Sequence, residues 1–311
     1  MKIAIIGTGA MGSIYAARLA EADHDVWAVD MWEAHVDAIN AQGLRVEGPD
    51  GVILSKSLRA TRQLSDAGPC DLYVIATKAS GVATSAQAIA KAIPANAVVL
   101  TIQNGLGAGE RIAAHLPAHH VMLGVAEGFG ASMAGPGTAR HTSMKQIRLG
   151  MMSGGADPRL EEVANVWRSG GFTIETYEDI EQLIWEKLLC NVTLSGPCTI
   201  FGCNVAELRA DPERWQVALG CMREAYAVGR TKGVEFSFDD ADAYVTAFAE
   251  RVGTAKPSML QDFEAGRLSE LDAINGAIPP LASQFDIPTP YNNTVCAVIR
   301  AHEARLKGAS K

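Results

Sequence analysis

The sequence predicts two domains of different class: a mostly parallel α/β domain over residues 1–178 and an all-α domain over residues 179–311. The first observation is that the chain has 311 residues, 48% of them hydrophobic and 20% charged, which suits two packed globular domains. The second is that the first half alternates short apolar runs with helix-like segments, which is typical of a parallel sheet covered by helices on both faces. The third is that almost every segment after residue 178 has helical periodicity.

Short apolar runs predict the strands of the first domain, and helical spacing between them predicts its helices. The predicted strands span 2–6, 24–29, 71–76, 97–102 and 121–125, followed by a last strand over 172–177. The predicted helices span 11–22, 32–42, 81–93 and 109–115. The stretch 124–150 is rich in Gly, Ser and Thr, and we expect its strand-like pieces to extend the edge of the same sheet.

The second domain is expected to begin with a long helix. Asp179, followed three residues later by Gln182, is typical of a capping box at a helix start. Proline-containing segments predict where the helices of this domain are interrupted: Gly196-Pro197, Asp211-Pro212, Lys256-Pro257, Pro279-Pro280 and 287–290.

Composition excludes several classes of protein. The net charge of -8 disfavours a nucleic-acid partner, because a polyanion would be repelled. No apolar run reaches the roughly 18 residues that span a bilayer, and the apolar start of the chain is too short for a secretory signal. The six cysteines show no spacing typical of a metal site, so we expect them to be reduced and mostly buried. These features favour a cytoplasmic protein.

A glycine motif follows the first predicted strand and opens the first predicted helix. It reads Gly7-Thr8-Gly9-Ala10-Met11-Gly12. In that context Gly7 permits the tight turn, Gly9 lets a pyrophosphate approach the backbone, and Gly12 allows close packing of the helix. Free N–H groups at the helix start, including those of Ala10 and Met11, would bind the phosphates. The motif predicts a dinucleotide-binding domain of the Rossmann type.

Asp30 ends the second apolar run, 18 positions after Gly12. A carboxylate at this place accepts hydrogen bonds from the adenosine ribose and repels a 2′-phosphate. Because Met31 and Trp32 follow instead of an arginine, the sequence favours NAD(H) over NADP(H). An arginine that the fold brings close would change that preference. The alternative for Asp30 is a solvated helix N-cap.

Polar residues follow two further predicted strands, where ligands of an open parallel sheet bind. Thr77-Lys78-Ala79 follows one strand and Gln103-Asn104-Gly105 follows the other. We expect Lys78 and Asn104 to contact the cofactor or the substrate, although Lys78 could be an ordinary solvated lysine. His141 is expected to be structural.

The second domain carries a further set of polar residues. Lys187 and Asn191 are four apart on the predicted long helix and therefore share a face, with Ser195 one turn beyond. Ser258 is predicted to be an N-cap, and Glu270, twelve residues later on the same helical stretch, is expected to face the same cleft. Taken alone, Lys187 could equally be a surface lysine with a snorkelling stem.

Together these motifs resemble the ketopantoate reductase (2-dehydropantoate 2-reductase) family nearly end to end. The most specific part is the stretch from Pro257-Ser258 to Asn275-Gly276. The resemblance implies reduction of a 2-oxo acid to a 2-hydroxy acid with a nicotinamide cofactor, and a homodimer through the helical domain. It implies Lys187 as the general acid and Glu270 as a residue that binds and orients the substrate. It implies the remaining roles as follows: Asn104, Asn191 and Ser258 would contact substrate, and Lys78 would serve the cofactor–substrate junction.

Two positions depart from the pattern of that family. Members specific for ketopantoate commonly carry a second asparagine where this chain has Ser195, which is still expected to line the substrate site. Many members use NADPH and carry a basic residue where this chain has Asp30-Met31-Trp32, so NADP(H) stays possible by resemblance. NAD-dependent D-2-hydroxyacid dehydrogenases of the mandelate type share the scaffold and are the main alternative.

A β-hydroxyacid dehydrogenase and a dinucleotide sensor fit the sequence less well. The β-hydroxyacid dehydrogenases share the glycine start and a Lys-x-x-x-Asn helix, but this chain has Leu183-Ile184-Trp185-Glu186 in place of the glycine-rich segment before the lysine. A sensor that binds a dinucleotide without catalytic activity would not need both Lys187 and Glu270.

Overall fold

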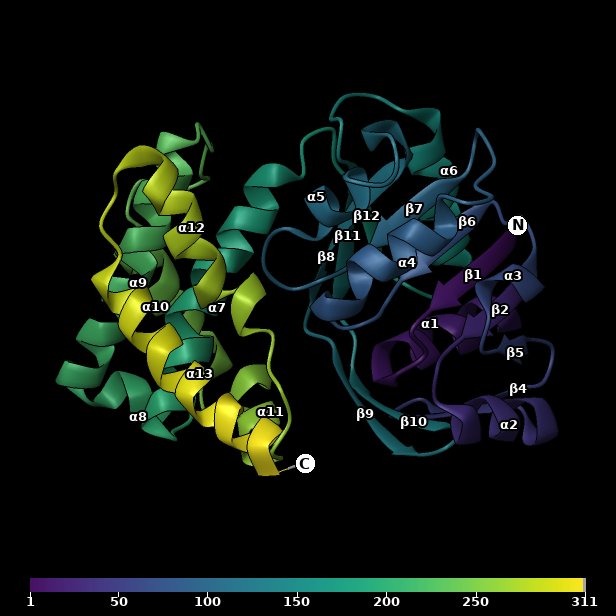
Figure 1. Ribbon diagram of the computed structural model, residues 1–311, viewed down its shortest axis with the longest axis horizontal. Coiled ribbons are helices and arrows are strands. Elements are labelled where there is room, and N and C mark those ends of the chain that lie inside the picture. The colour runs from purple at the N-terminus through teal and green to yellow at the C-terminus, as the bar shows by residue number, and fades with distance from the viewer. Residues whose placement is uncertain (310–311) are drawn as a thin grey trace. The chain divides into compact units, whose positions relative to one another are not determined.

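The computed structural model describes residues 1–309, with side chains through Leu306, and divides them into two compact units (Figure 1). The first unit comprises Met1–Gln103 and Ala108–Ile180, and the second comprises Asn104–Gly107 and the described chain from Glu181. The units therefore divide two residues after the predicted boundary of 178, and the short segment Asn104–Gly107 belongs to the second unit. The functional roles predicted for the two domains stay predictions.

The first unit contains a mostly parallel sheet of eight strands in the order β12-β11-β8-β7-β6-β1-β2-β5. All neighbouring pairs are parallel except β11 and β8, which confirms the predicted α/β class. The strands of this sheet are β1 (Lys2–Ile6), β2 (Asp25–Val29), β5 (Arg59–Thr61), β6 (Leu72–Ile75), β7 (Val98–Thr101), β8 (Val121–Glu127), β11 (Gln146–Met151) and β12 (Ile174–Thr176). The helices of the unit are α1 (Ala10–Glu21), α2 (Glu33–Gln42), α3 (Leu64–Ala67), α4 (Val82–Ile89), α5 (Ala108–Ala113) and α6 (Pro158–Ser169).

Alternation along β1 shows why both faces of this sheet need helices. Ile3 and Ile5 are fully buried in one core, which contains residues of α1 and α6. Ala4 and Ile6 point the other way, into a second core with residues of α4 and α5. Because successive side chains of a strand leave on opposite faces, an all-apolar strand such as this one is stable only between two layers.

The prediction for residues 124–150 was partly wrong. Of the strands in this stretch, β11 joins the main sheet, whereas β9 (Gly130–Gly135) and β10 (Thr138–Ser143) do not. They form a second sheet with β3 (Leu44–Gly48) and β4 (Gly51–Ser55), in the order β4-β3-β10-β9. Residue pattern identifies a strand but does not select its partner, and β10 pairs in parallel with β3, about ninety residues earlier in the chain.

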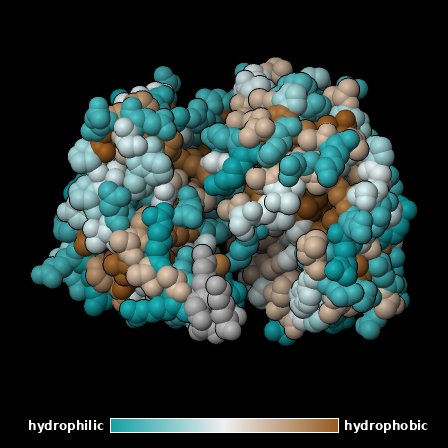
Figure 2. Space-filling model, viewed as in Figure 1, coloured by the Kyte–Doolittle hydropathy of each residue, from teal (hydrophilic) through white to brown (hydrophobic). Residues whose placement is uncertain are grey.

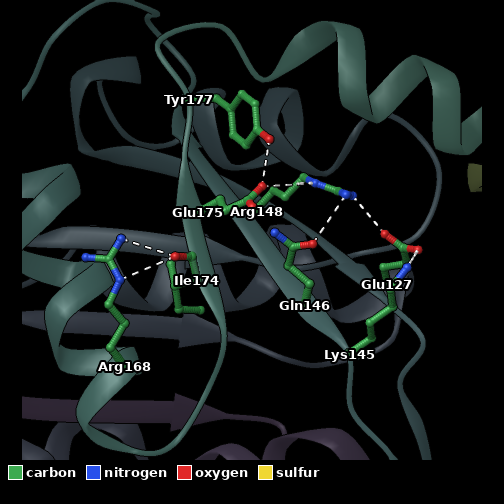
Figure 3. A network of polar contacts seen from close by, with 8 residues as sticks. All are labelled: Glu127, Lys145, Gln146, Arg148, Arg168, Ile174, Glu175 and Tyr177. Carbon is green, nitrogen blue, oxygen red and sulfur yellow. Dashed lines mark hydrogen bonds and ion pairs between the residues drawn. The ribbon is translucent and has the colours of Figure 1, made fainter.

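Charged side chains occupy the outer edge of the main sheet (Figure 3). The Arg148 guanidinium lies 3.1 Å from a carboxylate oxygen of Glu127 and 3.7 Å from one of Glu175. Lys145 also pairs with Glu127, and the hydroxyl of Tyr177 donates a 2.8 Å hydrogen bond to Glu175. A short edge strand with charged side chains is a poor template for pairing with another chain, so this network protects the edge.

The second unit is helical, as predicted, and packs around α7 (Glu181–Phe201), which supplies Trp185, Leu188 and Leu189 to the core (Figure 1). Its other helices are α8 (Val205–Ala210), α9 (Pro212–Thr231), α10 (Ala241–Val252), α11 (Ser258–Glu264), α12 (Ile278–Ala282) and α13 (Pro290–Ala309). The predicted interruption at Asp211-Pro212 is confirmed: the side chain of Asp211 caps α9 by accepting from the N–H groups of Glu213 and Arg214. The predicted interruption at Gly196-Pro197 is wrong, because α7 continues through Pro197.

All six cysteines are buried, as expected, and no disulfide joins them in the described part of the chain. Within the described chain, no helix is both long and apolar enough to cross a bilayer. Hydrophilic and hydrophobic residues are intermingled on the face of the molecule that Figure 2 shows. Among the exposed large apolar side chains are Met31 and Trp32, directly after Asp30.

Candidate active site

The glycine motif forms a tight turn between β1 and α1, and two of its glycines are required by the geometry. Gly7 has a φ of +89°, and a Cβ there would lie 2.7 Å from the backbone nitrogen of Thr77. A Cβ at Gly12 would lie 2.0 Å from the carbonyl oxygen of Gly7. Gly9 differs, because a Cβ there would have nothing within 4 Å. The turn is therefore closed at Gly7 and Gly12 and open at Gly9, as the sequence predicted.

The start of α1 fits the diphosphate of a dinucleotide. Gly9 is the N-cap residue and no side chain caps the helix, so the N–H groups of the first turn, which begins at Ala10 and Met11, receive no side-chain cap. The first turn of this 12-residue helix also carries no acidic residue. Free N–H groups and the positive end of the helix dipole together bind anions.

The neighbouring strand ends hold two buried polar atoms that need a partner. Thr77 follows β6 and Gln103 follows β7, and the Gln103 amide nitrogen donates a 2.6 Å hydrogen bond to the carbonyl oxygen of Thr77. The Thr77 hydroxyl and the Gln103 amide oxygen have no hydrogen-bond partner among the described residues. Because buried polar atoms are normally paired, their position beside the glycine turn supports a polar ligand there.

Asp30 lies beside the glycine turn. One carboxylate oxygen accepts a 2.9 Å hydrogen bond from the N–H of Trp32, and the other lies 3.5 Å from the hydroxyl of Thr8. The N-cap residue of α2 is Trp32, so the alternative in which Asp30 is that cap is wrong. Lys78 follows Thr77 as the exposed residue before a short 3-10 turn, and its predicted role stays a prediction.

Lys187, Asn191 and Ser195 all lie on α7, so the predicted shared helix face is confirmed. Lys187 and Asn191 are partly exposed, whereas Ser195 is buried. Trp185, on the same helix, is among the largest fully buried side chains. The lysine and the asparagine thus lie at the border of a packed apolar core, which holds the helix that carries them.

The predicted placement of Ser258 and Glu270 on one helix is wrong. Pro257 is the N-cap residue of α11 and Ser258 is its first helical residue. The helix ends at Glu264, where Gly266 adopts a φ of +66° and its N–H turns back to the carbonyl of Phe263. A residue in the left-handed region ends an α-helix, so a whole-turn count from Ser258 to Glu270 does not apply.

Glu270 is instead positioned by a 3-10 turn, which it precedes as the N-cap residue of Leu271–Ala273. The segment that carries Asn104 packs on this turn: the N–H of Leu106 donates a 2.8 Å hydrogen bond to the carbonyl oxygen of Ala273. Gly105 has a φ of +82°, and a Cβ there would lie 2.0 Å from the same oxygen. The structure therefore brings the segments of Asn104 and Glu270 together, although they are distant in sequence.

Asn275 lies at the end of the stretch that most specifically resembles the family, but sequence reasoning did not indicate its role; it is fully buried beside α7. In a regular helix the N–H of residue 196 donates to the carbonyl of residue 192. Here the Asn275 side chain contacts both groups: its oxygen accepts from the Gly196 N–H at 3.2 Å, and its nitrogen donates to the Val192 carbonyl at 3.0 Å. Pro197 is the next residue and has no N–H to donate. Asn275 thus supports α7 directly beside Asn191.

The support continues through two further buried side chains. The Asn275 amide nitrogen also donates to the Asn292 amide oxygen at 3.0 Å, and the Asn292 amide nitrogen donates to Glu224 at 2.7 Å. Glu224 also accepts from the backbone N–H groups of Tyr291 and Asn292 in the first turn of α13. The available sequence signals were Asn275 in an apolar segment and Pro197 within a helical pattern. Neither signal indicated that the asparagine contacts the helix beside the proline.

The chain matches two family models, described as "Ketopantoate reductase PanE/ApbA" over residues 3–154 and "Ketopantoate reductase PanE/ApbA C terminal" over residues 179–303. A 2-dehydropantoate 2-reductase of Mesorhizobium japonicum is 31% identical over 319 aligned positions, which cover 96% of this chain and 97% of that protein.

Solved structures agree with that result. The crystal structure of a PanE/ApbA family ketopantoate reductase from Ralstonia eutropha JMP134 has a TM-score of 0.90 at 28% identity, covering 99% of this chain and 100% of that one. A ternary structure of D-mandelate dehydrogenase with NADH and anilino(oxo)acetate has a TM-score of 0.87 at 27% identity, covering 99% of this chain and 100% of that one. With both halves of its length matched by these family models, the chain belongs to the ketopantoate reductase family.

Proposed function

We propose that this enzyme reduces a 2-oxo acid to a 2-hydroxy acid, with the nicotinamide dinucleotide bound by the first unit and substrate binding and catalysis carried by the second. The observation that supports this most is the open start of α1 behind Gly7 and Gly9, a site for a diphosphate in a chain that belongs to an NAD(P)-dependent oxidoreductase family. When bound, the dinucleotide supplies the hydride.

Lys187 is the proposed general acid. Hydride addition to a carbonyl carbon builds negative charge on the oxygen, and an ammonium group both stabilises that charge and supplies the proton. Its position on α7, at the border of a packed core, supports this role because a fixed backbone limits the positions its ammonium can take. Glu270 is proposed to bind and orient the substrate from the 3-10 turn, together with Asn104 of the segment packed on that turn.

The remaining proposed contacts come from the resemblance to the family. Asn191, Ser195 and Ser258 are proposed to bind the substrate, and Lys78 is proposed to serve the junction of cofactor and substrate. Ser195 is buried, so a contact from it requires substrate to reach the inner side of α7. A 2-oxo acid carries a carboxylate, and in a chain of net charge -8 local cations such as Lys78 and Lys187 would be needed to attract it.

NAD(H) is the proposed cofactor. The Asp30 carboxylate is held beside the glycine turn by the N–H of Trp32, where it would accept hydrogen bonds from the two ribose hydroxyls. The same carboxylate would repel the 2′-phosphate of NADP(H). Direct binding measurements with both dinucleotides test this, and an equal or tighter affinity for NADPH would contradict it.

Two kinds of 2-oxo acid are candidates for the substrate. Ketopantoate is the substrate named for the Mesorhizobium japonicum relative, and its turnover here would make this a pantothenate-pathway enzyme. A bulkier 2-oxo acid is favoured by Ser195, which is smaller than the asparagine of ketopantoate-specific members, and by the similarity to D-mandelate dehydrogenase. The alternative is therefore an NAD-dependent D-2-hydroxyacid dehydrogenase of the mandelate type.

The experiment is a cofactor-oxidation assay with ketopantoate and with bulkier 2-oxo acids such as phenylglyoxylate, each with NADH and with NADPH. Turnover of ketopantoate supports the first candidate, and turnover of the bulkier acids alone supports the second. Dinucleotide binding without turnover of any 2-oxo acid would contradict the proposal and favour a sensor. A homodimer through the helical unit is also proposed, and a monomer mass in light scattering at micromolar concentration would contradict it.

A further inference from the structure

An arginine distant in sequence follows the strand that neighbours Asp30. Strands β2 and β5 are parallel neighbours, and Val29 pairs with Thr61 at their last register position. The N–H of Asp30 donates a 3.1 Å hydrogen bond to the carbonyl oxygen of Thr61, so the backbones that continue β2 and β5 stay paired one residue further. The residues that leave the sheet side by side are therefore Asp30 and Arg62.

Arg62 forms an ion pair with a second acidic residue, Glu33. Its guanidinium lies 3.0 Å from a carboxylate oxygen of Glu33, the first residue of α2. The side chains of Arg62 and Glu33 are 48% and 69% exposed. Asp30, Glu33 and Arg62 thus make up a cluster, defined by the two adjacent strand ends and the Glu33–Arg62 ion pair, with a combined formal charge of about -1 at neutral pH. All three belong to the first unit.

We propose that the Glu33–Arg62 pair sets the selectivity between NAD(H) and NADP(H): Arg62 is the group able to bind a 2′-phosphate, and Glu33 withholds it. The inference rests on the proposed function only in that a dinucleotide binds at the glycine turn. Asp30 then accepts hydrogen bonds from a ribose and repels a 2′-phosphate, and the Glu33–Arg62 pair sets how far that repulsion is offset.

The physical basis is a competition between two anions for one guanidinium. An exposed ion pair is weak and is screened by salt, so a ligand can break it. A guanidinium binds phosphate through two parallel hydrogen bonds, and a phosphate with nearly two charges is a stronger partner than one carboxylate. In the wild type, however, the 2′-phosphate meets a cluster that is already negative. Neutralising Glu33 removes both the competitor and one repulsive charge.

NADH provides an internal control for this effect. Its adenosine ribose carries hydroxyls, which bind the Asp30 carboxylate and need no cation. A change at Glu33 or Arg62 should therefore alter the affinity for NADPH and leave that for NADH within twofold. The same reasoning applies to the fragments 2′,5′-ADP and 5′-AMP, which differ only in the 2′-phosphate.

The test measures dissociation constants of NADH and NADPH by fluorescence titration, and of 2′,5′-ADP and 5′-AMP by calorimetry. The variants are Glu33→Gln, Arg62→Gln and the double variant. The matched control is Glu250→Gln, which removes the same charge from another exposed pair, with Arg209 in the second unit. We expect Glu33→Gln to tighten NADPH and 2′,5′-ADP about five- to tenfold, since an exposed pair of this kind accounts for up to about fivefold alone. Arg62→Gln should weaken both several-fold.

The double variant carries the decisive comparison. If Arg62 is the phosphate ligand, Glu33→Gln in the Arg62→Gln background gains less than twofold for NADPH. An equal gain in both backgrounds would overturn the role of Arg62 and leave only a general charge effect. No gain from Glu33→Gln in an otherwise wild-type chain would overturn the role of Glu33. If wild type bound neither NADH nor NADPH, the proposed function would fail as well, whereas NADH binding with no effect of these variants would refute this inference alone.

Discussion

Asn275 offers a sharp test of how α7 is supported. The substitution Asn275→Leu keeps a side chain of similar size in a site with no solvent exposure. It removes the partners of three groups: the Gly196 N–H, the Val192 carbonyl and the Asn292 amide oxygen. A buried polar group left without a partner costs about 1–3 kcal/mol. Because the helix can re-form part of its own bonding at residue 196, we expect a total loss of about 3–5 kcal/mol in the free energy of unfolding.

Such a loss is a large share of the roughly 5–15 kcal/mol that stabilises a typical domain. The assay is urea unfolding at equilibrium, combined with hydrogen exchange of peptides from α7 that include Gly196. The matched control is Asn293→Leu, because Asn293 is an exposed asparagine on α13 whose side chain donates a hydrogen bond to Thr289, one helical turn away. We expect the control to change stability by less than about 0.5 kcal/mol. A loss below about 1 kcal/mol for Asn275→Leu, with unchanged exchange at α7, would refute the supporting role.

Two tests concern the first unit. Gly12→Ala places a Cβ 2.0 Å from the Gly7 carbonyl oxygen and should lower the free energy of unfolding by about 1–3 kcal/mol. In Gly9→Ala the new Cβ meets nothing within 4 Å, so the variant should keep its melting temperature but bind NADH at least tenfold more weakly. If both variants changed stability and NADH binding equally, this division of roles would be contradicted. Burial lowers the pKa of the fully buried His35 below its usual 6.5, and its ring accepts a 2.9 Å hydrogen bond from the Gly137 N–H. Since the folded state disfavours the protonated ring, the stability it contributes is fully present above pH 6.5 and is lost as the pH falls below that value. Between pH 7.5 and pH 5 the melting temperature of His35→Gln should therefore fall less than that of wild type, and an equal fall would contradict the assignment.

Local signals predicted much of this structure. The strand at 2–6, the glycine turn and the helix face of Lys187 and Asn191 each depend on residues within a few positions of one another, so periodicity and turn chemistry were sufficient. Helix ends were harder to predict. The end of α11 at Glu264 separates Ser258 from Glu270, and the glycine at position 266, which adopts the left-handed conformation, was the sequence signal for that helix end.

Features made by distant residues could not be predicted. Strand β10 pairs with β3 in a separate sheet, and nothing within either strand distinguishes this from an extended main sheet. Asn275 meets Gly196 across 79 positions, and the pairing of β2 with β5 brings the backbone of Asp30 to that of Thr61. These contacts are set by tertiary packing, which a single sequence pattern does not encode.

Hydride transfer to a 2-oxo acid with Lys187 as the proton donor is the proposed reaction of this enzyme. The most direct measurement compares wild type with Lys187→Ala for NADH binding and for the rate of NADH oxidation with the best 2-oxo acid of the panel. We expect the variant to bind NADH within about twofold of wild type and to lose at least a hundredfold in kcat, as follows from removal of a general acid. A variant that oxidises NADH at the wild-type rate would exclude Lys187 as the general acid.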